Sequence, residues 1–235
     1  MSSTLAIYAC HIDKRLPEKE INQLLEFIDP AKNERILRFR NWQDAHLSLF
    51  ADLLVRVAAW QREKIRNRDI TFFNDVYGKP VFSSQPHIHF NVSHSGRWVV
   101  CGIDSSETGI DIERIDDVDL SLSEHFFSAD EHKDILGSID PLGRFFDYWT
   151  LKESYLKFVG KGLSEPLNSF TVCLLPHDRI QIRIMGVPVE GVHFKQYYIA
   201  EGYKLAVCCK HRKFPAECIF TTQTEIGRII KKISD

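Results

Sequence analysis

The chain has 235 residues, of which 44% are hydrophobic, so it is long enough to bury a sizeable core and is not disordered as a whole. Its 30 Lys and Arg nearly balance its 32 Asp and Glu, and the net charge is -2. A strong global field for nucleic acid or an anionic membrane is therefore excluded, and any site for a polyanion has to be local.

The N-terminal sequence and the cysteines predict a cytoplasmic protein. The start, MSSTLAIYACHIDKR, reaches charged residues after a few apolar ones, and no apolar run approaches the ~18 residues that span a bilayer. The six cysteines are scattered, without the paired spacing of a disulfide framework. We expect reduced thiols, no membrane partner and no nucleic-acid partner.

Along the first 104 residues, the pattern predicts strands around a long helix. A strand-like run near residues 4–10 is followed by a helix start that Asp29 can cap. Apolar residues then recur at helical spacing from Leu47 to Val57, which predicts a longer amphipathic helix. Further strand-like runs lie near residues 70–73, 88–93 and 98–103.

The remaining residues follow a similar order. After a strand-like run at 109–112, a second helix start is capped by Ser128, and Asp140 and Gly160 mark the ends of a strongly apolar helix over residues 141–160. Strand-like runs follow near residues 168–174, 180–184, 193–199 and 203–209.

Two local patterns recur about 100 residues apart, which indicates an internal duplication. Residues 27–37 are similar to residues 126–136, and the hairpin around Gly96 is similar to the hairpin around Gly202. Strands grouped around helices without regular alternation favour an α+β fold with mainly antiparallel sheets. We expect two similar halves, residues 1–104 and 105–235, each a sheet packed with a long helix.

Local charge differs sharply between two windows of the sequence. Residues 29–68 contain nine basic and five acidic side chains, whereas residues 104–140 contain twelve acidic and two basic ones. Such runs are usually solvated faces, but neighbouring basic and acidic regions also suit an anionic ligand held with a divalent cation.

Asp111 and Glu113 lie on one face of the strand predicted at residues 109–112, because side chains alternate along a strand. Neighbouring carboxylates repel each other, and a hard cation such as Mg²⁺ would neutralise them. A solvated strand face is the alternative interpretation.

The helix predicted over residues 141–160 places Trp149, Glu153 and Lys157 on one face at i, i+4 and i+8. Charged side chains in so apolar a helix are costly without partners. A metal ligand at Glu153 and a phosphate contact at Lys157 would supply those partners, and a pair that only supports the helix is the alternative.

The segment FNVSHSG, residues 90–96, ends a strand with hydroxyls, an imidazole and a glycine, which suits anion binding. A hydrolytic Ser93–His94 pair is disfavoured because adjacent strand residues point in opposite directions and no Gly-x-Ser-x-Gly elbow is present. The same geometry disfavours a zinc site at Cys208 and Cys209. No P-loop or dinucleotide-type glycine fingerprint occurs.

Four motifs in the same order give the sequence its resemblance to a known family. YGKP (77–80), FNVSHSG (90–96), GIDIE (109–113) and WTLKESYLKFVGKGL (149–163) resemble the 4'-phosphopantetheinyl transferases of the longer, duplicated type that includes the surfactin-synthetase activator. The resemblance extends through about residue 210. Ser154 departs from the alanine that many relatives carry after the Lys-Glu pair.

This resemblance implies Mg²⁺-dependent transfer of the phosphopantetheine arm of coenzyme A to a serine of an apo acyl or peptidyl carrier protein, with release of adenosine 3',5'-bisphosphate. It also implies a monomer whose halves are related by a pseudo-twofold axis, with the ligand between them. A non-catalytic carrier-binding module and a metal-dependent nucleotide pyrophosphate hydrolase are the competing hypotheses.

The resemblance also assigns roles to residues. Asp111, Glu113 and Glu153 would hold Mg²⁺, and Lys157 would contact the phosphates during catalysis. Because the acceptor serine needs a base to take its proton, we also choose Glu153 as that base, acting directly or through a metal-bound water. The remaining binding residues are Ser93 and His94 at phosphate groups, Lys79 beside the adenosine, and Lys32, Arg35 and Ser48 at the 3'-phosphate.

Overall fold

The computed structural model describes residues 5–160 and 165–234. Its first sheet has the strand order β12-β1-β5-β4. The central strands pair antiparallel, as the grouping of the strands around helices predicts, whereas β12 lies parallel to β1. The strands of this sheet are β1 (Ala6–His11), β4 (His89–Ser95), β5 (Trp98–Asp104) and β12 (Ile219–Thr222).

A long helix, α3 (Trp42–Glu63), covers this first sheet and forms the centre of its core. The Asn41 side chain accepts a hydrogen bond from the backbone N–H of Gln43 and begins the helix, so α3 is longer than the pattern between residues 47 and 57 predicts. The helices around it are α1 (Glu18–Leu25), α2 (Pro30–Leu37), where Asp29 is the predicted cap, and α7 (Gln223–Ser234).

The second sheet, of order β10-β11-β6, supports the other long helix, α6 (Pro141–Val159). As predicted, Asp140 caps the N-terminus of α6 and Gly160 its C-terminus. Ser128 caps α5 (Ala129–Gly137) in a full capping box with Glu131. The strands of this sheet are β6 (Thr108–Arg114), β10 (His193–Tyr197) and β11 (Tyr203–Cys209).

Smaller elements flank the two sheets. On the first half they are η1 (Asn67–Asp69) and the hairpin of β2 (Phe72–Asn74) and β3 (Pro80–Phe82). On the second half they are η2 (Leu120–Leu122), α4 (Ser123–Phe126), α5 (Ala129–Gly137), η4 (Leu167–Ser169), β7 (Thr171–Leu175), β8 (Arg179–Ile184) and β9 (Val187–Pro188).

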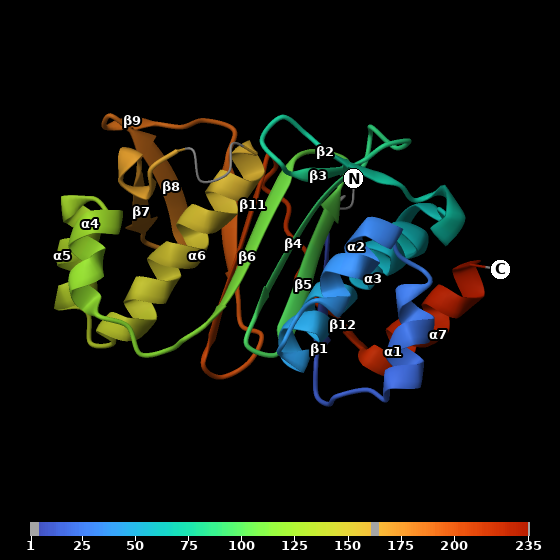
Figure 1. Ribbon diagram of the computed structural model, residues 1–235. Coiled ribbons are helices and arrows are strands. Elements are labelled where there is room, and N and C mark those ends of the chain that lie inside the picture. Colours follow the sequence, from blue (N-terminus) through green and yellow to red (C-terminus); the bar gives the residue numbers. More distant parts are fainter. Residues whose placement is uncertain (1–4, 161–164, 235) are drawn as a thin grey trace.

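The two halves meet along β4, β5 and β6. In Figure 1 these strands lie in the middle of the molecule, with α1, α2, α3 and α7 on one side and α4, α5 and α6 on the other. Apolar side chains of β1 and β5 pack with those of β6 and β11 in one shared core. Side chains of β4 also reach β6 directly, since the Asn91 side chain accepts a hydrogen bond from the Ile110 backbone N–H at 2.9 Å.

The α+β class with two halves of antiparallel sheet packed on helices is confirmed. The division between residues 104 and 105 stays a prediction. β12 and α7 lie within residues 105–235 but pack with the first half. Neither they nor α1 were predicted. In the described part of the chain, no helix has the length and apolar character needed to cross a membrane.

Candidate active site

A cleft of about 1170 Å³ lies between the two halves and is lined by α2, α3, the β2–β3 hairpin, β4, β6 and α6. It brings together nine of the ten site residues predicted from the sequence. They are Lys32, Arg35, Ser48, Ser93, His94, Asp111, Glu113, Glu153 and Lys157.

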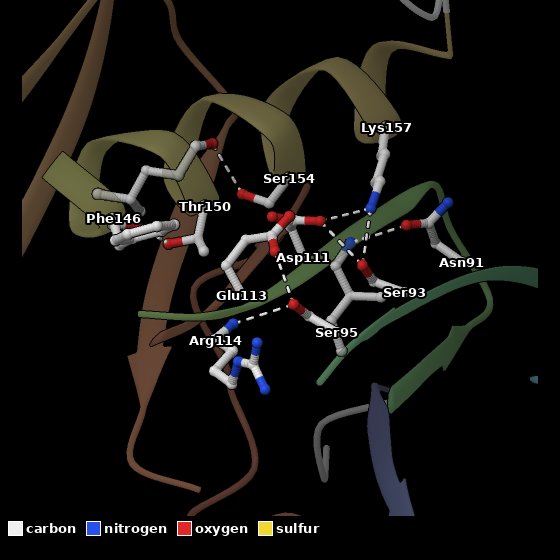
Figure 2. A network of polar contacts seen from close by, with 12 residues as sticks. Asn91, Ser93, Ser95, Asp111, Glu113, Arg114, Phe146, Thr150, Ser154 and Lys157 are labelled. Atoms are coloured by element: carbon white, nitrogen blue, oxygen red, sulfur yellow. Dashed lines mark hydrogen bonds and ion pairs between the residues drawn. The ribbon is translucent and has the colours of Figure 1, made fainter. Parts of the chain in front are cut away.

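Asp111 is at the centre of the polar network in this cleft, and Figure 2 shows the side chains that converge on it from β4, β6 and α6. Lys157 Nζ lies 2.5 Å from Asp111 Oδ1 and donates a second hydrogen bond to Ser93 Oγ at 2.9 Å. Ser93 Oγ in turn donates to Asp111 Oδ1 at 2.9 Å. The predicted placement of Asp111, Lys157 and Ser93 in one site is thus seen directly.

One oxygen of Asp111 has no partner in the described structure. The residue is only 1% exposed, and its Oδ2 atom is buried and makes no hydrogen bond. Burial raises the pKa of the Asp111 carboxyl in spite of the opposing effect of Lys157. A buried carboxylate oxygen without a donor is a place where a cation would be stabilised.

Glu113 and Glu153 are the two other predicted metal ligands, and both line the cleft with Asp111. Ser95 Oγ donates to Glu113 Oε2 at 2.8 Å, yet burial and the neighbouring Asp111 raise the pKa of Glu113 to about 7. Burial and Asp111 raise the pKa of Glu153 as well. Asp111 therefore makes it harder for Glu113 and Glu153 to ionise, and the positive charge of Lys157 offsets this only in part.

The three carboxylates do not form a finished metal centre. Within residues 5–160 and 165–234, no group of three His, Cys, Asp or Glu side chains is arranged to hold a metal ion. The contacts explain this arrangement, since Asp111 is turned to Lys157 and Glu113 is turned to Ser95.

Helix α6 presents Glu153 and Lys157 to the cleft because the adjacent face of the helix, at Ser154 and Phe158, is fixed on β6. A Cβ atom on Gly109 of β6 would overlap the backbone of Ser154 and Phe158, so only glycine lets the helix approach this closely. The buried hydroxyl of Ser154 donates to the Leu151 carbonyl at 2.8 Å (Figure 2). The helix therefore accommodates the hydroxyl of Ser154.

The neighbouring charge, Lys152, has a structural partner. It is fully buried, and its ammonium lies 2.9 Å from Glu131 Oε1 and donates to the carbonyls of Leu167 and Phe170 at 2.9 and 2.6 Å. Glu131 also accepts the backbone N–H of Val172. Of the Lys-Glu pair in the motif, only Glu153 therefore reaches the cleft.

The basic wall of the cleft has a buried support that the sequence analysis missed. Lys32 Nζ lies 2.8 Å from Asp52 Oδ2, and Arg56 Nε donates to Asp52 Oδ1 at 2.5 Å. Arg56 Nη1 also donates a hydrogen bond to Asn67 Oδ1 at 2.9 Å. Arg56 and Lys32 together hold the pKa of Asp52 below its ordinary value in spite of burial. The i, i+4 spacing of Asp52 and Arg56 within an apolar helix was the signal available in the sequence.

His94 and Lys79 differ in where their side chains lie. His94 lines the cleft, and its side chain remains accessible there. Partial desolvation by the cleft and the nearby Lys157 cation lower the pKa of its imidazole. Lys79 is the one predicted site residue outside the lining, although Gly78 and Pro80 on either side of it line the cleft. The ligand contact predicted for the Lys79 side chain therefore stays a prediction.

Comparison with known proteins assigns the chain to a family. Residues 16–106 match the model "4'-phosphopantetheinyl transferase, N-terminal", and residues 107–208 match the "4'-phosphopantetheinyl transferase superfamily". The chain is 37% identical to 4'-phosphopantetheinyl transferase Sfp of Bacillus subtilis (strain 168), over 94% of this chain and 100% of that protein. It is 36% identical to the 4'-phosphopantetheinyl transferase gsp of Aneurinibacillus migulanus, over 80% and 78% of the two chains. The chain therefore belongs to the 4'-phosphopantetheinyl transferases.

Proposed function

We propose that the cleft between the two halves is where this 4'-phosphopantetheinyl transferase takes the phosphopantetheine arm of coenzyme A and passes it to a serine of an apo carrier protein. The observation that carries this proposal is the cluster of Lys157, Ser93 and Asp111. It joins α6, β4 and β6 at one point of a cleft large enough for an extended nucleotide ligand.

Coenzyme A carries phosphate groups, and the cleft offers cations and hydroxyls for them. Lys157, Ser93 and His94 suit the pyrophosphate, because they lie beside the carboxylates where the reaction would occur. Lys32, Arg35 and Ser48 on α2 and α3 suit the 3'-phosphate. The Lys32 ammonium forms an ion pair with Asp52 and is therefore oriented before the ligand binds.

We propose that Asp111, Glu113 and Glu153 hold Mg²⁺. The donor set is one of hard oxygen ligands, which Mg²⁺ prefers, and Asp111 Oδ2 is buried without a partner. The raised pKa values of all three carboxyls fit the same interpretation. Ser95 occupies only one oxygen of Glu113, which leaves Oε1 for the ion, and the ion would neutralise charge on the pyrophosphate.

In the transfer, the acceptor serine oxygen forms a bond to the phosphorus that carries the pantetheine arm. The bond from this phosphorus to the bridging oxygen breaks, and adenosine 3',5'-bisphosphate leaves with the electron pair. Glu153 is our choice for the base that takes the serine proton, since its raised pKa makes it more basic than an ordinary carboxylate. Lys157 is placed to donate hydrogen bonds to the departing phosphate.

We further propose a monomeric enzyme that acts in the cytoplasm. One chain supplies both walls of the cleft, so the site needs no second copy. All six cysteines are free thiols, and five of them are buried, which fits a reducing compartment.

The intact mass of an apo carrier protein tests the proposed activity after incubation with the enzyme, coenzyme A and Mg²⁺. We expect the carrier to gain the mass of phosphopantetheine on one serine, and to gain nothing when Mg²⁺ is chelated. Binding without modification would favour a carrier-binding module. Release of adenosine bisphosphate without an acceptor would favour a pyrophosphate hydrolase.

A further inference from the structure

Lys79 lies in the turn between β2 and β3 and makes its contacts with the other half of the molecule. Its ammonium donates to the backbone carbonyl of Lys157 at 3.0 Å and to Glu107 Oε2 at 2.9 Å. The other oxygen of Glu107 lies 2.9 Å from His89 Nδ1. The Lys79 side chain is only 12% exposed, so these contacts fix its ammonium away from solvent.

The carbonyl of Lys157 is one that α6 cannot satisfy by itself. The last four carbonyls of an α-helix have no intrahelical N–H partner, and α6 ends at Val159. The backbone N–H of Gly160 returns to the Leu156 carbonyl at 2.9 Å, which closes the helix. The Lys157 carbonyl instead receives the Lys79 ammonium, whose positive charge also suits the negative end of the helix dipole.

Lys157 is therefore held at both of its ends. Its backbone carbonyl is bound by Lys79, and its ammonium is bound by Ser93 and Asp111. The close approach of α6 to Gly109 fixes the middle of the same helix turn against β6. These contacts together define the position of the Lys157 ammonium in the cleft.

We propose that Lys79 is a positioning residue that holds the C-terminal end of α6, and thereby sets the place of the Lys157 ammonium. Glu107 keeps the Lys79 ammonium at that carbonyl. This assignment rests on the phosphate-binding role proposed above for Lys157. It differs from a contact between the Lys79 side chain and the ligand, because Gly78 and Pro80 line the cleft and Lys79 does not.

The test compares Lys79→Met, Glu107→Gln and the double variant in steady-state transfer to an apo carrier. Methionine keeps the apolar stem and removes the cation, so the fold should survive. Because misplacing a catalytic group by ~1 Å can cost about 100-fold, we expect Lys79→Met to lower kcat by about 10- to 100-fold, with the KM for coenzyme A nearly unchanged. Glu107→Gln should lower kcat less, and the double variant should match Lys79→Met, since the two residues act through one contact.

Lys19→Met, on the exposed surface of α1, is the matched control and should leave both constants unchanged. A raised KM for coenzyme A at full kcat in Lys79→Met, with Glu107→Gln silent, would show a direct ligand contact and overturn the assignment. Unfolding temperatures of all variants should stay within a few degrees of the wild type. A kcat loss that merely follows a lower unfolding temperature would also overturn it.

Amide hydrogen exchange of the peptide around residues 155–160 separates this proposal from the proposed function. Lys79→Met should exchange faster there than the wild type, and Lys157→Met should not. Unchanged exchange in Lys79→Met contradicts the positioning role whatever the activity. If Lys157→Met retains full transfer activity, the phosphate-binding role of Lys157 fails, and the exchange result still decides whether Lys79 holds the helix end.

Discussion

At the scale of single residues, burial opposes ionisation of the three carboxyl groups proposed as metal ligands in the cleft. Asp111, Glu113 and Glu153 each have a raised pKa, with burial as the largest cause, and the Asp111 carboxylate adds to the effect at Glu113 and Glu153. Lys157 compensates only part of this charge. By contrast, Asp52 is as buried as Asp111 but has two cationic partners, and its pKa is lowered. The difference separates a carboxylate that stabilises the fold from the carboxylates that we propose bind Mg²⁺.

Glu153→Gln should separate the base from the metal ligand. Glutamine keeps the shape and one carbonyl oxygen but cannot accept the serine proton, and a general base contributes about 10² to 10⁴-fold. We expect a kcat loss in that range with a modest change in the KM for coenzyme A. Measuring kcat over a series of Mg²⁺ concentrations checks this. Full recovery at saturating Mg²⁺ would mean that Glu153 is only a ligand.

Asp52→Asn should destabilise the protein in a pH-dependent way. Because the folded-state pKa lies below the ordinary 3.8, ionised Asp52 stabilises the fold at every pH above 3.8, and this stabilisation is lost as the pH falls through the lowered value. We expect Asn to cost about 3 kcal/mol, equally at pH 7 and pH 5, and less below pH 3.8. Urea unfolding at several pH values measures this. A cost that grows toward low pH would contradict the assignment.

At the scale of elements, the site residues that the sequence predicts lie on helices and strands, with the exception of Lys79 in the turn between β2 and β3. A strand period of two placed Asp111 and Glu113, and a helical period placed Glu153 and Lys157. The contact between Lys79 and the carbonyl of Lys157 joins residues 78 positions apart, and no local period encodes it. Turn and helix-end contacts of this kind depend on how the two halves dock.

Gly109→Ala should push α6 away from β6. The new Cβ would overlap backbone atoms, which cannot move aside as a flexible side chain can, so we expect a loss of about 3 kcal/mol in the free energy of unfolding. Gly102→Ala is the matched control on β5, where the Cβ would sit 3.6 Å from Thr108 Oγ1, and should change stability by less than about 1 kcal/mol. Equal effects of the two variants would show that α6 does not depend on the close approach.

At the scale of the whole molecule, two sheets share one apolar core, and the C-terminal segment returns to the first half. The pattern of alternation revealed most of the sheet strands, because their buried faces are apolar. It missed β12, where Ile219 and Phe220 are both exposed and no alternation is present. It also missed α7, although Ile226, Ile230 and Ile233 form a buried stripe there.

Ile230→Ala tests whether α7 belongs to the core of the first half. Ile230 is fully buried, so its truncation should cost about 3 kcal/mol in the free energy of unfolding, while the folded variant keeps its transfer activity. Ile139→Ala, at a fully exposed position, is the control and should change stability by less than about 0.5 kcal/mol. Denaturant unfolding of both variants measures the difference. A cost at Ile230 no larger than at Ile139 would mean that α7 is not part of the core.

The most direct test of the central claim is the rate of carrier modification by Asp111→Asn, followed by intact mass across a series of Mg²⁺ concentrations. Asparagine keeps the size of the side chain and removes the charge that joins α6 to β4 and that we propose binds Mg²⁺. We expect the rate to fall by at least about 10²-fold and not to recover at high Mg²⁺, while the unfolding temperature stays near that of the wild type. A rate within about twofold of the wild type at limiting Mg²⁺ would contradict the assignment of this cleft as the metal-dependent transfer site.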